Sequence, residues 1–228
     1  MIFLICWADI AQEGGAIRGY VLDSRDNPIG CYIEACNEKT KACPQSATTD
    51  ADGAYSMRGL PDGKYRFKIS ADGFYPFEIR DVLIDGHAVK LLPVVRLEAG
   101  LIADCGIDRR PDYYRFIGGP EAGVGGVVTN DAGMPIRGAT VTLYVSGRGP
   151  LASQKTKSNG AFSFLTLEPT AKGYRVLIAR DGFFTEEQRY LTTLPGLEST
   201  YAPISMESCS PGRCQPYLKQ IRVLGTCE

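Results

Sequence analysis

Histidine and tryptophan are nearly absent from this chain of 228 residues, which has one of each, His87 and Trp7. A zinc hydrolase or a non-haem iron oxygenase needs two or more histidine ligands, and a Ser-His-Asp triad would have to use His87. Because His87 follows the turn signal Asp85-Gly86, a solvated turn histidine is the simpler interpretation. We therefore predict a non-catalytic protein with no cofactor and no metal.

An excess of charge of one sign is also missing. The 25 basic and 26 acidic residues give a net charge of -1, which predicts no nucleic-acid partner. Apolar runs stay below the length of about 18 residues that a transmembrane helix needs. Residues 1–8 are nearly all apolar and resemble the end of a secretory leader without its basic start. We interpret residues 1–14 as a leader remnant; a ragged terminus or an apolar first strand is the alternative.

No Cys-x-x-Cys pair occurs among the eight cysteines, which excludes zinc-ribbon and thioredoxin-type spacing. Two pairs lie close in sequence, Cys36 with Cys43 and Cys209 with Cys214. This clustering favours disulfides, and hence a secreted, periplasmic or cell-surface protein, over a set of unrelated buried thiols.

The strongest signal present is an internal repeat with a period near 107 residues. The matching segments keep their order, and they are Gly15–Val21 with Ala122–Val128, Asn27–Gly30 with Met134–Gly138, Thr49–Ser56 with Lys157–Ser163, Gly63–Ile69 with Lys172–Ile178, and Ala71–Phe74 with Arg180–Phe183. We predict one domain at 15–98, an ordered linker at 99–121, a second domain at 122–207 and a cysteine-bearing tail at 208–228.

Each copy reads as a series of short strands. Apolar and polar residues alternate, as in Tyr65, Phe67 and Ile69, which is typical of a half-buried strand. Asp52-Gly53 and Asn159-Gly160 suit hairpin turns that need a positive φ, although Asp50 and Asp52 also resemble half of a calcium loop. About seven strands per copy predict an all-β protein of two tandem seven-stranded antiparallel β-sandwiches.

The order of motifs is that of a known family. The chain contains Gly19-Tyr-Val21, Pro135-Ile-Arg-Gly-Ala-Thr-Val141, Thr49-Asp-Ala-Asp-Gly-Ala-Tyr55, Gly59-Leu-Pro-Asp-Gly-Lys-Tyr65 and Ala71-Asp-Gly-Phe74. It resembles the carboxypeptidase regulatory-like family, which implies two sandwiches of the transthyretin-like, or prealbumin-like, type. Such modules are accessory units of exported enzymes, receptors or surface proteins, and they have no catalytic residues to carry over.

Related sandwiches include surface-adhesin repeats, which often carry a Lys–Asn crosslink whose lysine lies on the first strand. That strand offers Arg18 in one copy and no basic residue in the other, so we expect no such crosslink.

The repeat also sorts the cysteines. Cys31 aligns with Ala139 on the inward face, which predicts a buried free thiol, and Cys6 would leave with a leader. The six others allow fifteen pairings. We expect the three pairings Cys36–Cys43, Cys209–Cys214 and Cys105–Cys227.

Aromatic residues in the linker give the second functional hypothesis. Tyr113, Tyr114 and Phe116 cluster there, and stacked aromatic rings can bind sugars. The first hypothesis is a non-catalytic accessory or interaction protein of the cell envelope, with an unknown protein or glycan as partner. The alternative is a carbohydrate-binding protein that uses these aromatic residues. Hydrolase activity is a third hypothesis, for which the fold alone is a weak argument.

Overall fold

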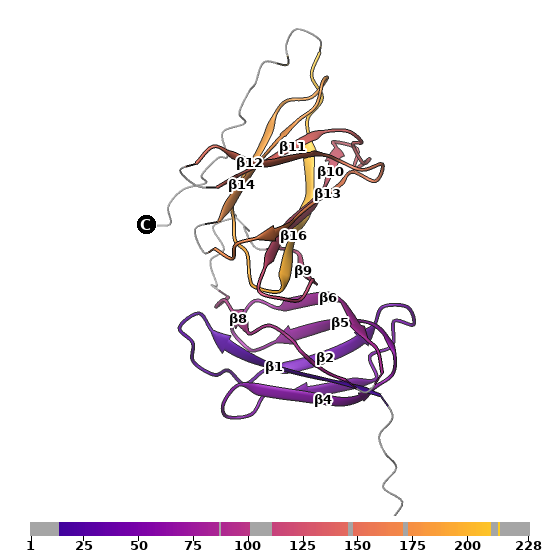
Figure 1. The fold of residues 1–228 in the computed structure, drawn as a ribbon, viewed down its shortest axis with the longest axis vertical. Helices are drawn as coiled ribbons and strands as arrows, with labels where there is room; N and C mark the ends of the chain where they lie inside the picture. Colours follow the sequence, from indigo (N-terminus) through magenta and orange to yellow (C-terminus); the bar gives the residue numbers. More distant parts are fainter. Residues whose placement is uncertain are drawn as a thin grey trace, which may run out of the picture. The chain divides into compact units, whose positions relative to one another are not determined.

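The computed structural model describes residues 14–86, 88–100, 111–145, 148–170, 173–210 and 214. The chain divides into two compact units, unit 1 (Met1–Gly100) and unit 2 (Leu101–Glu228). All regular elements in the described ranges are strands (Figure 1). This confirms the all-β prediction.

Unit 1 contains two packed sheets. The first has the order β4-β1-β7, with β8 also paired to β1, and the second has the order β6-β5-β2-β3. The strands are β1 (Gly15–Asp23), β2 (Tyr32–Asn37), β3 (Gln45–Thr48), β4 (Ala54–Leu60), β5 (Gly63–Ser70), β6 (Phe77–Ile84), β7 (Val89–Leu91) and β8 (Val95–Leu97).

Unit 2 repeats this topology. One sheet has the order β13-β10-β16-β9 and the other has the order β12-β11-β14-β15. The strands are β9 (Tyr113–Phe116), β10 (Ala122–Asn130), β11 (Thr140–Val145), β12 (Pro150–Lys155), β13 (Ala161–Leu167), β14 (Tyr174–Ala179), β15 (Glu186–Leu191) and β16 (Leu197–Met206).

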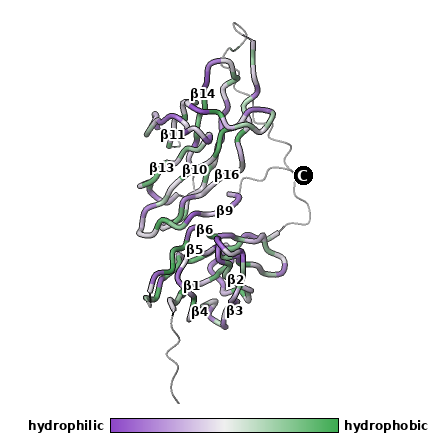
Figure 2. Tube along the Cα trace, turned by 90° about the vertical axis from the view of Figure 1, so that its right-hand side faces the viewer, coloured by the Kyte–Doolittle hydropathy of each residue, from purple (hydrophilic) through white to green (hydrophobic). Residues whose placement is uncertain are grey.

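Alternating residues of these strands build the cores. In β5 the side chains of Tyr65, Phe67 and Ile69 are buried, while those between them are not. Strand β14 follows the same pattern, and Figure 2 shows the hydropathy of each residue along the strands. Each such side chain contributes about 1.5–3 kcal/mol when it leaves water. The core of unit 2 consists of Val124, Val128, Ile136, Ala139, Val141, Leu143, Phe162, Phe164, Leu167, Tyr174, Val176, Ile178, Leu191, Ile204 and Met206.

Two details of the strands differ from the sequence-based prediction. The first strand of each repeat pairs in parallel with the end of that repeat, β1 with β7 and β8, and β10 with β16, so the sandwiches are not purely antiparallel. The predicted strand at 88–97 is divided into β7 and β8, and Pro93 lies between them. Proline has no N–H to donate to the ladder, which explains the interruption.

The turns at Gly53 and Gly160 connect two sheets. Both glycines have the predicted positive φ, 73° and 75°. A Cβ on Gly53 would lie 2.5 Å from the Val21 carbonyl oxygen, and Gly160 approaches the Val128 carbonyl in the same way. The prediction that these turns close hairpins is wrong. In unit 1 β3 pairs with β2 whereas β4 pairs with β1, and in unit 2 β12 pairs with β11 whereas β13 pairs with β10.

A threonine before each of these turns ties together two connections that run between the sheets. The hydroxyl of Thr49 accepts a hydrogen bond from the Cys31 amide at 2.8 Å and donates one to the Ile29 carbonyl at 2.6 Å. Thr156 does the same in unit 2, with the amide of Ala139 and the carbonyl of Ile136. Both units therefore satisfy the same backbone groups with the same side chain.

Candidate functional site

The aromatic residues predicted to bind a ligand lie in a strand of unit 2. Strand β9 pairs in antiparallel with β16, with Phe116 opposite Leu197 and Tyr113 opposite Thr200. The amide of Asp112 extends this pairing by donating to the Thr200 carbonyl at 2.9 Å. This part of the predicted linker therefore belongs to the sheet of unit 2, whereas residues 101–110 lie outside the described residues.

Strand geometry separates the three aromatic side chains. Successive residues of a strand point to opposite faces of the sheet. Tyr114 and Phe116 share the face of the buried Leu197, whereas Tyr113 shares the face of Glu198. All three are half-buried. They do not form one continuous aromatic platform.

An ion pair crosses the face on which Tyr113 lies. Arg115 of β9 pairs with Glu198 of β16, whose side chain is only 3% exposed. The hydroxyl of Ser163 on β13 donates to the other carboxylate oxygen of Glu198 at 2.5 Å. Gly125 of β10 lies directly beneath, because a Cβ there would lie 2.5 Å from the same oxygen. Four strands thus combine to hold one buried carboxylate.

The second sheet of unit 2 carries a similar buried acid. The Glu187 side chain, 3% exposed, accepts a hydrogen bond from Arg175 at 2.9 Å. The Arg175 guanidinium also lies 4.3 Å from the centre of the Tyr144 ring, within range of a cation–π contact. Both buried acids in the described part of unit 2 are therefore neutralised by a neighbouring arginine, which is the pattern of structural ion pairs.

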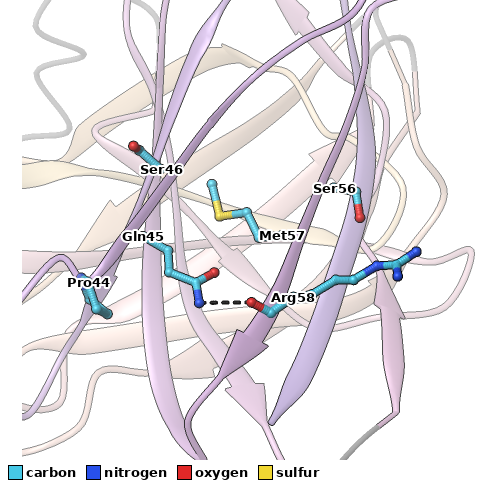
Figure 3. Close-up of a pocket in the computed structure, with 6 residues that line it drawn as sticks. All are labelled: Pro44, Gln45, Ser46, Ser56, Met57 and Arg58. Atoms are coloured by element: carbon cyan, nitrogen blue, oxygen red, sulfur yellow. Dashed lines mark hydrogen bonds between the residues drawn. The ribbon is translucent and has the colours of Figure 1, made fainter. Parts of the chain in front are cut away.

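Unit 1 has an open groove between the edge strands of its two sheets, β3 and β4 (Figure 3). The groove has a volume of about 620 Å³ and is lined by Pro44, Gln45, Ser46, Ser56, Met57 and Arg58. The amide nitrogen of Gln45 donates to the carbonyls of Arg58 and Gly59 at 2.8 and 3.1 Å. The glutamine thereby satisfies backbone groups of an edge strand, and the lining offers no nucleophile–base pair.

Among the described residues two disulfides are present, Cys36–Cys43 and Cys209–Cys214, with S–S distances of 2.07 and 1.97 Å. Cys31 is free and buried, and burial raises the pKa of its thiol to about 11. Such a thiol has little thiolate at neutral pH and is a poor nucleophile. The predicted Cys105–Cys227 pair and Cys6 lie outside the described residues.

Two groups of possible metal ligands occur in unit 1, and the second is the calcium alternative that the sequence suggested. Glu34, Cys36 and Cys43 offer ligand atoms within 4.8 Å of one another, but the two sulfurs are joined in the disulfide and provide no thiolate. A carboxylate oxygen of Asp50 accepts the amides of Asp52 and Ala54 at 3.0 and 2.9 Å, so it serves the turn. His87 lies outside the described residues.

The residues of the buried ion pairs were missed by sequence reasoning. The sequence held one partial signal, the glycines at 123, 125 and 126, which leave room above β10 for the Glu198 side chain. Its partner Arg115 gave no such signal, because it stands in the segment expected to be a linker.

A search of the described residues finds no helix that is long and apolar enough to cross a membrane. Among curated proteins, the chain is 23% identical to serine-aspartate repeat-containing protein D of Staphylococcus aureus over 199 residues, which cover 85% of this chain and 14% of that protein. It is 22% identical to serine-aspartate repeat-containing protein F of Staphylococcus epidermidis, covering 71% of this chain and 10% of that protein. The chain thus spans a small part of these relatives.

Among solved structures, the minor pilin GBS52 of Streptococcus agalactiae aligns over 86% of this chain and 97% of its own, with a TM-score of 0.34 and 15% identity. The stronger finding concerns the two repeats. Residues 16–97 and 123–207 each match the carboxypeptidase regulatory-like domain. The matched segments coincide with the two sandwiches and cover most of the sequence, so the chain belongs to the carboxypeptidase regulatory-like domain family, of which it contains two tandem copies.

Proposed function

We propose that this chain is a non-catalytic accessory or interaction protein of the cell envelope. The observation that carries the proposal is the use of its buried reactive groups. Among the described residues, the buried acids Glu187 and Glu198 are held by arginines, and Cys31 has a raised pKa. A catalytic site needs such groups to be poised toward a cavity, and here they stabilise sheets.

The disulfides support export. Cys36–Cys43 closes a short excursion of unit 1 in which Cys43 is exposed. Exposed thiols remain reduced in a cytosol and form stable disulfides in oxidising compartments. The two serine-aspartate repeat-containing relatives contain segments similar to these domains, which supports a role as one module of a larger assembly.

Trapping the thiols inside intact cells tests the proposal. Cells are treated with a permeant alkylating reagent, the protein is denatured and reduced, and the newly exposed thiols receive a second label. We expect Cys36, Cys43, Cys209 and Cys214 to carry the second label, as disulfides do. Full first-label modification of these four, as in a reducing compartment, contradicts export.

Cys31 provides the internal control. In a parallel sample the first reagent is added together with denaturant, and Cys31, as a buried free thiol, then takes the first label. Fractionation of the same cells then locates the protein, and we expect it in the envelope or the medium. Recovery in the cytosol alone contradicts the proposal.

Carbohydrate binding stays a prediction that no specific observation favours. Tyr113 and Tyr114 lie on opposite faces of β9, which argues against a shared stacking surface. Retention on an insoluble polysaccharide that is lost in the double variant Tyr113→Ala, Tyr114→Ala would favour the carbohydrate-binding alternative.

A further inference from the structure

Strand β7 of unit 1 forms an open sheet edge. It ends the order β4-β1-β7, and on its far side it has no paired strand among the residues that the structure describes. The Ala16 amide donates to the Ala88 carbonyl at 3.2 Å, and the Leu92 amide donates to the Arg18 carbonyl at 2.9 Å. Residues 88, 90 and 92 therefore direct their backbone groups toward β1. Because this direction alternates along a strand, the N–H and C=O groups of Val89 and Leu91 point to the open edge.

The side chains at this edge are apolar and exposed. Val89 is 50% exposed and Leu91 is 71% exposed, the highest value among the exposed large hydrophobic residues. Lysine often protects a sheet edge, but Lys90 instead directs its ammonium group to the Leu83 carbonyl and to Asp85. The edge thus combines unpaired backbone groups with exposed apolar side chains, the combination that accepts an added strand.

In unit 2 the equivalent sheet edge is paired with an additional strand, β9. Val89 pairs with Ala16 as Glu198 pairs with Gly123, so Val89 corresponds to Glu198. Glu198 and the neighbouring residues of β16 pair in antiparallel with β9. The fold therefore accommodates an antiparallel strand of about four residues at this position.

The charges indicate which strand would suit unit 1. In unit 2 the added strand supplies the cation, Arg115. A guanidinium nitrogen of Arg115 lies 3.4 Å from the Ser163 hydroxyl oxygen, above Gly125. In unit 1 the residue at the position of Gly125 is Arg18, since both pair with the equivalent serine of the neighbouring strand. The host strand thus already carries the cation, and the complementary added strand carries an acid at the position of Arg115.

We propose that β7 of unit 1 is a strand-addition site that takes an extended, acidic and apolar segment of a partner protein. A second copy of the chain is a poorer occupant, because pairing two three-residue edges buries far less than the roughly 1,200 Å² of a stable interface. The inference deepens the proposed function by naming the chemistry of its partner, and it rests on that function. Its test is independent of the thiol-trapping experiment, so either can fail alone.

A labelled peptide, Gly-Ser-Val-Val-Glu-Val-Ser-Gly, is titrated into the full chain while amide hydrogen exchange is followed by NMR. We expect the amides of Val89 and Leu91 to exchange fast in the free protein and at least tenfold more slowly with peptide. The Lys90 amide, which faces β1, serves as the unchanged reference.

Matched variants identify the site. Leu91→Glu is expected to weaken peptide binding at least tenfold, whereas Met134→Glu, which adds the same charge at an exposed residue of unit 2, leaves it unchanged. Arg18→Glu is expected to weaken binding of this peptide and to strengthen binding of the peptide with lysine in place of glutamate. Circular dichroism confirms that each variant is folded.

Several outcomes overturn the proposal. Slow exchange of the Val89 and Leu91 amides in the free chain means that the edge is already covered. Binding only by a variant without residues 1–13 assigns the edge to the chain's own first segment. Dimerisation that Leu91→Glu abolishes assigns it to a second copy. The absence of binding at millimolar peptide rejects strand addition.

Discussion

Units 1 and 2 have one topology, but they stabilise equivalent surfaces with different chemistry. Unit 1 places the Cys36–Cys43 disulfide where unit 2 places Tyr144, since Cys36 and Tyr144 pair with equivalent residues of the next strand, Arg66 and Arg175. At the other sheet, unit 2 has a buried ion pair and an added strand where unit 1 has the exposed Val89. The duplicated core leaves the outer faces free to diverge.

The largest expected effect concerns a feature that both units share. Gly53→Ala and Gly160→Ala each place a Cβ against a carbonyl oxygen at positive φ. We expect each to destabilise its own unit by about 3 kcal/mol or more. Hydrogen exchange of peptides from each unit, analysed by mass spectrometry, separates the two. Gly73→Ala, at positive φ with open space around it, is the control and should lose only about 1 kcal/mol. Equal losses at all three positions would contradict the steric argument.

A buried charge makes the stability of unit 2 more sensitive to substitution on this face than the stability of unit 1. Glu198→Ala leaves Arg115 and Ser163 without their partner, and we expect a loss of about 2–3 kcal/mol from the free energy of unfolding of unit 2. Arg18→Ala on the corresponding face of unit 1 removes an exposed side chain and should change stability by less than about 0.5 kcal/mol. Denaturant unfolding followed by exchange in each unit measures both. Similar losses of unfolding free energy in the two variants would contradict this difference between the units.

Reduction is expected to affect the core of unit 1. Replacing Cys36 and Cys43 by serine should destabilise unit 1 by about 2 kcal/mol, from the loop that the disulfide closes. Tyr144→Leu in unit 2 loses only a half-exposed cation–π contact, about 0.5–1 kcal/mol. The melting temperature with and without reductant checks the prediction. A reductant effect that persists unchanged in the double serine variant would contradict the prediction and assign the effect to another disulfide, such as Cys209–Cys214.

The buried hydroxyl of Tyr55 is expected to lower the stability of unit 1. Among the described atoms, the Tyr55 hydroxyl has no hydrogen-bond partner, and Phe162 stands at the equivalent position of unit 2. We expect Tyr55→Phe to stabilise unit 1 by about 1 kcal/mol, because an unsatisfied buried group costs about that much. A loss of stability would mean that the hydroxyl has a partner, such as a buried water.

The same hydroxyl predicts a dependence on pH. Burial raises the pKa of Tyr55 above its ordinary value of 10.0, so the folded state favours the neutral form. This stabilisation is complete below pH 10 and is lost as the pH rises above it, because only the unfolded chain then ionises. Tyr55→Phe should flatten this part of the alkaline stability profile of unit 1.

The last expected effect concerns the buried thiol of Cys31. Because Ala139 fills the equivalent place, Cys31→Ala should cost less than about 1.5 kcal/mol. The raised pKa and the burial of the thiol predict slow alkylation of the native protein at pH 8 and fast alkylation after unfolding. Fast labelling of the native protein would contradict this burial.

The repeat and the strand pattern could be predicted because they are local. Alternation in β5 and the positive φ at Gly53 follow from neighbouring residues, and the inward face of Cys31 follows from the alignment of the two repeats. The partners of the strands on either side of Gly53 were mispredicted. A turn signal fixes the backbone at the turn. It does not say whether the strand before the turn and the strand after it pair with each other or enter opposite sheets.

The candidate site was less predictable than the fold. Tyr113, Tyr114 and Phe116 were recognised as a group, but only the pairing of β9 with β16 places them on two faces. The partnership of Arg115 with Glu198 joins residues 83 positions apart in sequence, as the difference of their numbers shows. No spacing rule connects such residues before the strand register is known.

The sequence by itself determined the duplication, the all-β architecture and the membership of the family, because hydrophobic alternation and turn residues act over short distances. Tertiary structure decided which edge of each sheet is covered, which acids are buried and which strands run parallel. These properties depend on pairing between segments far apart in the chain, whose register is set by the packing of the whole core.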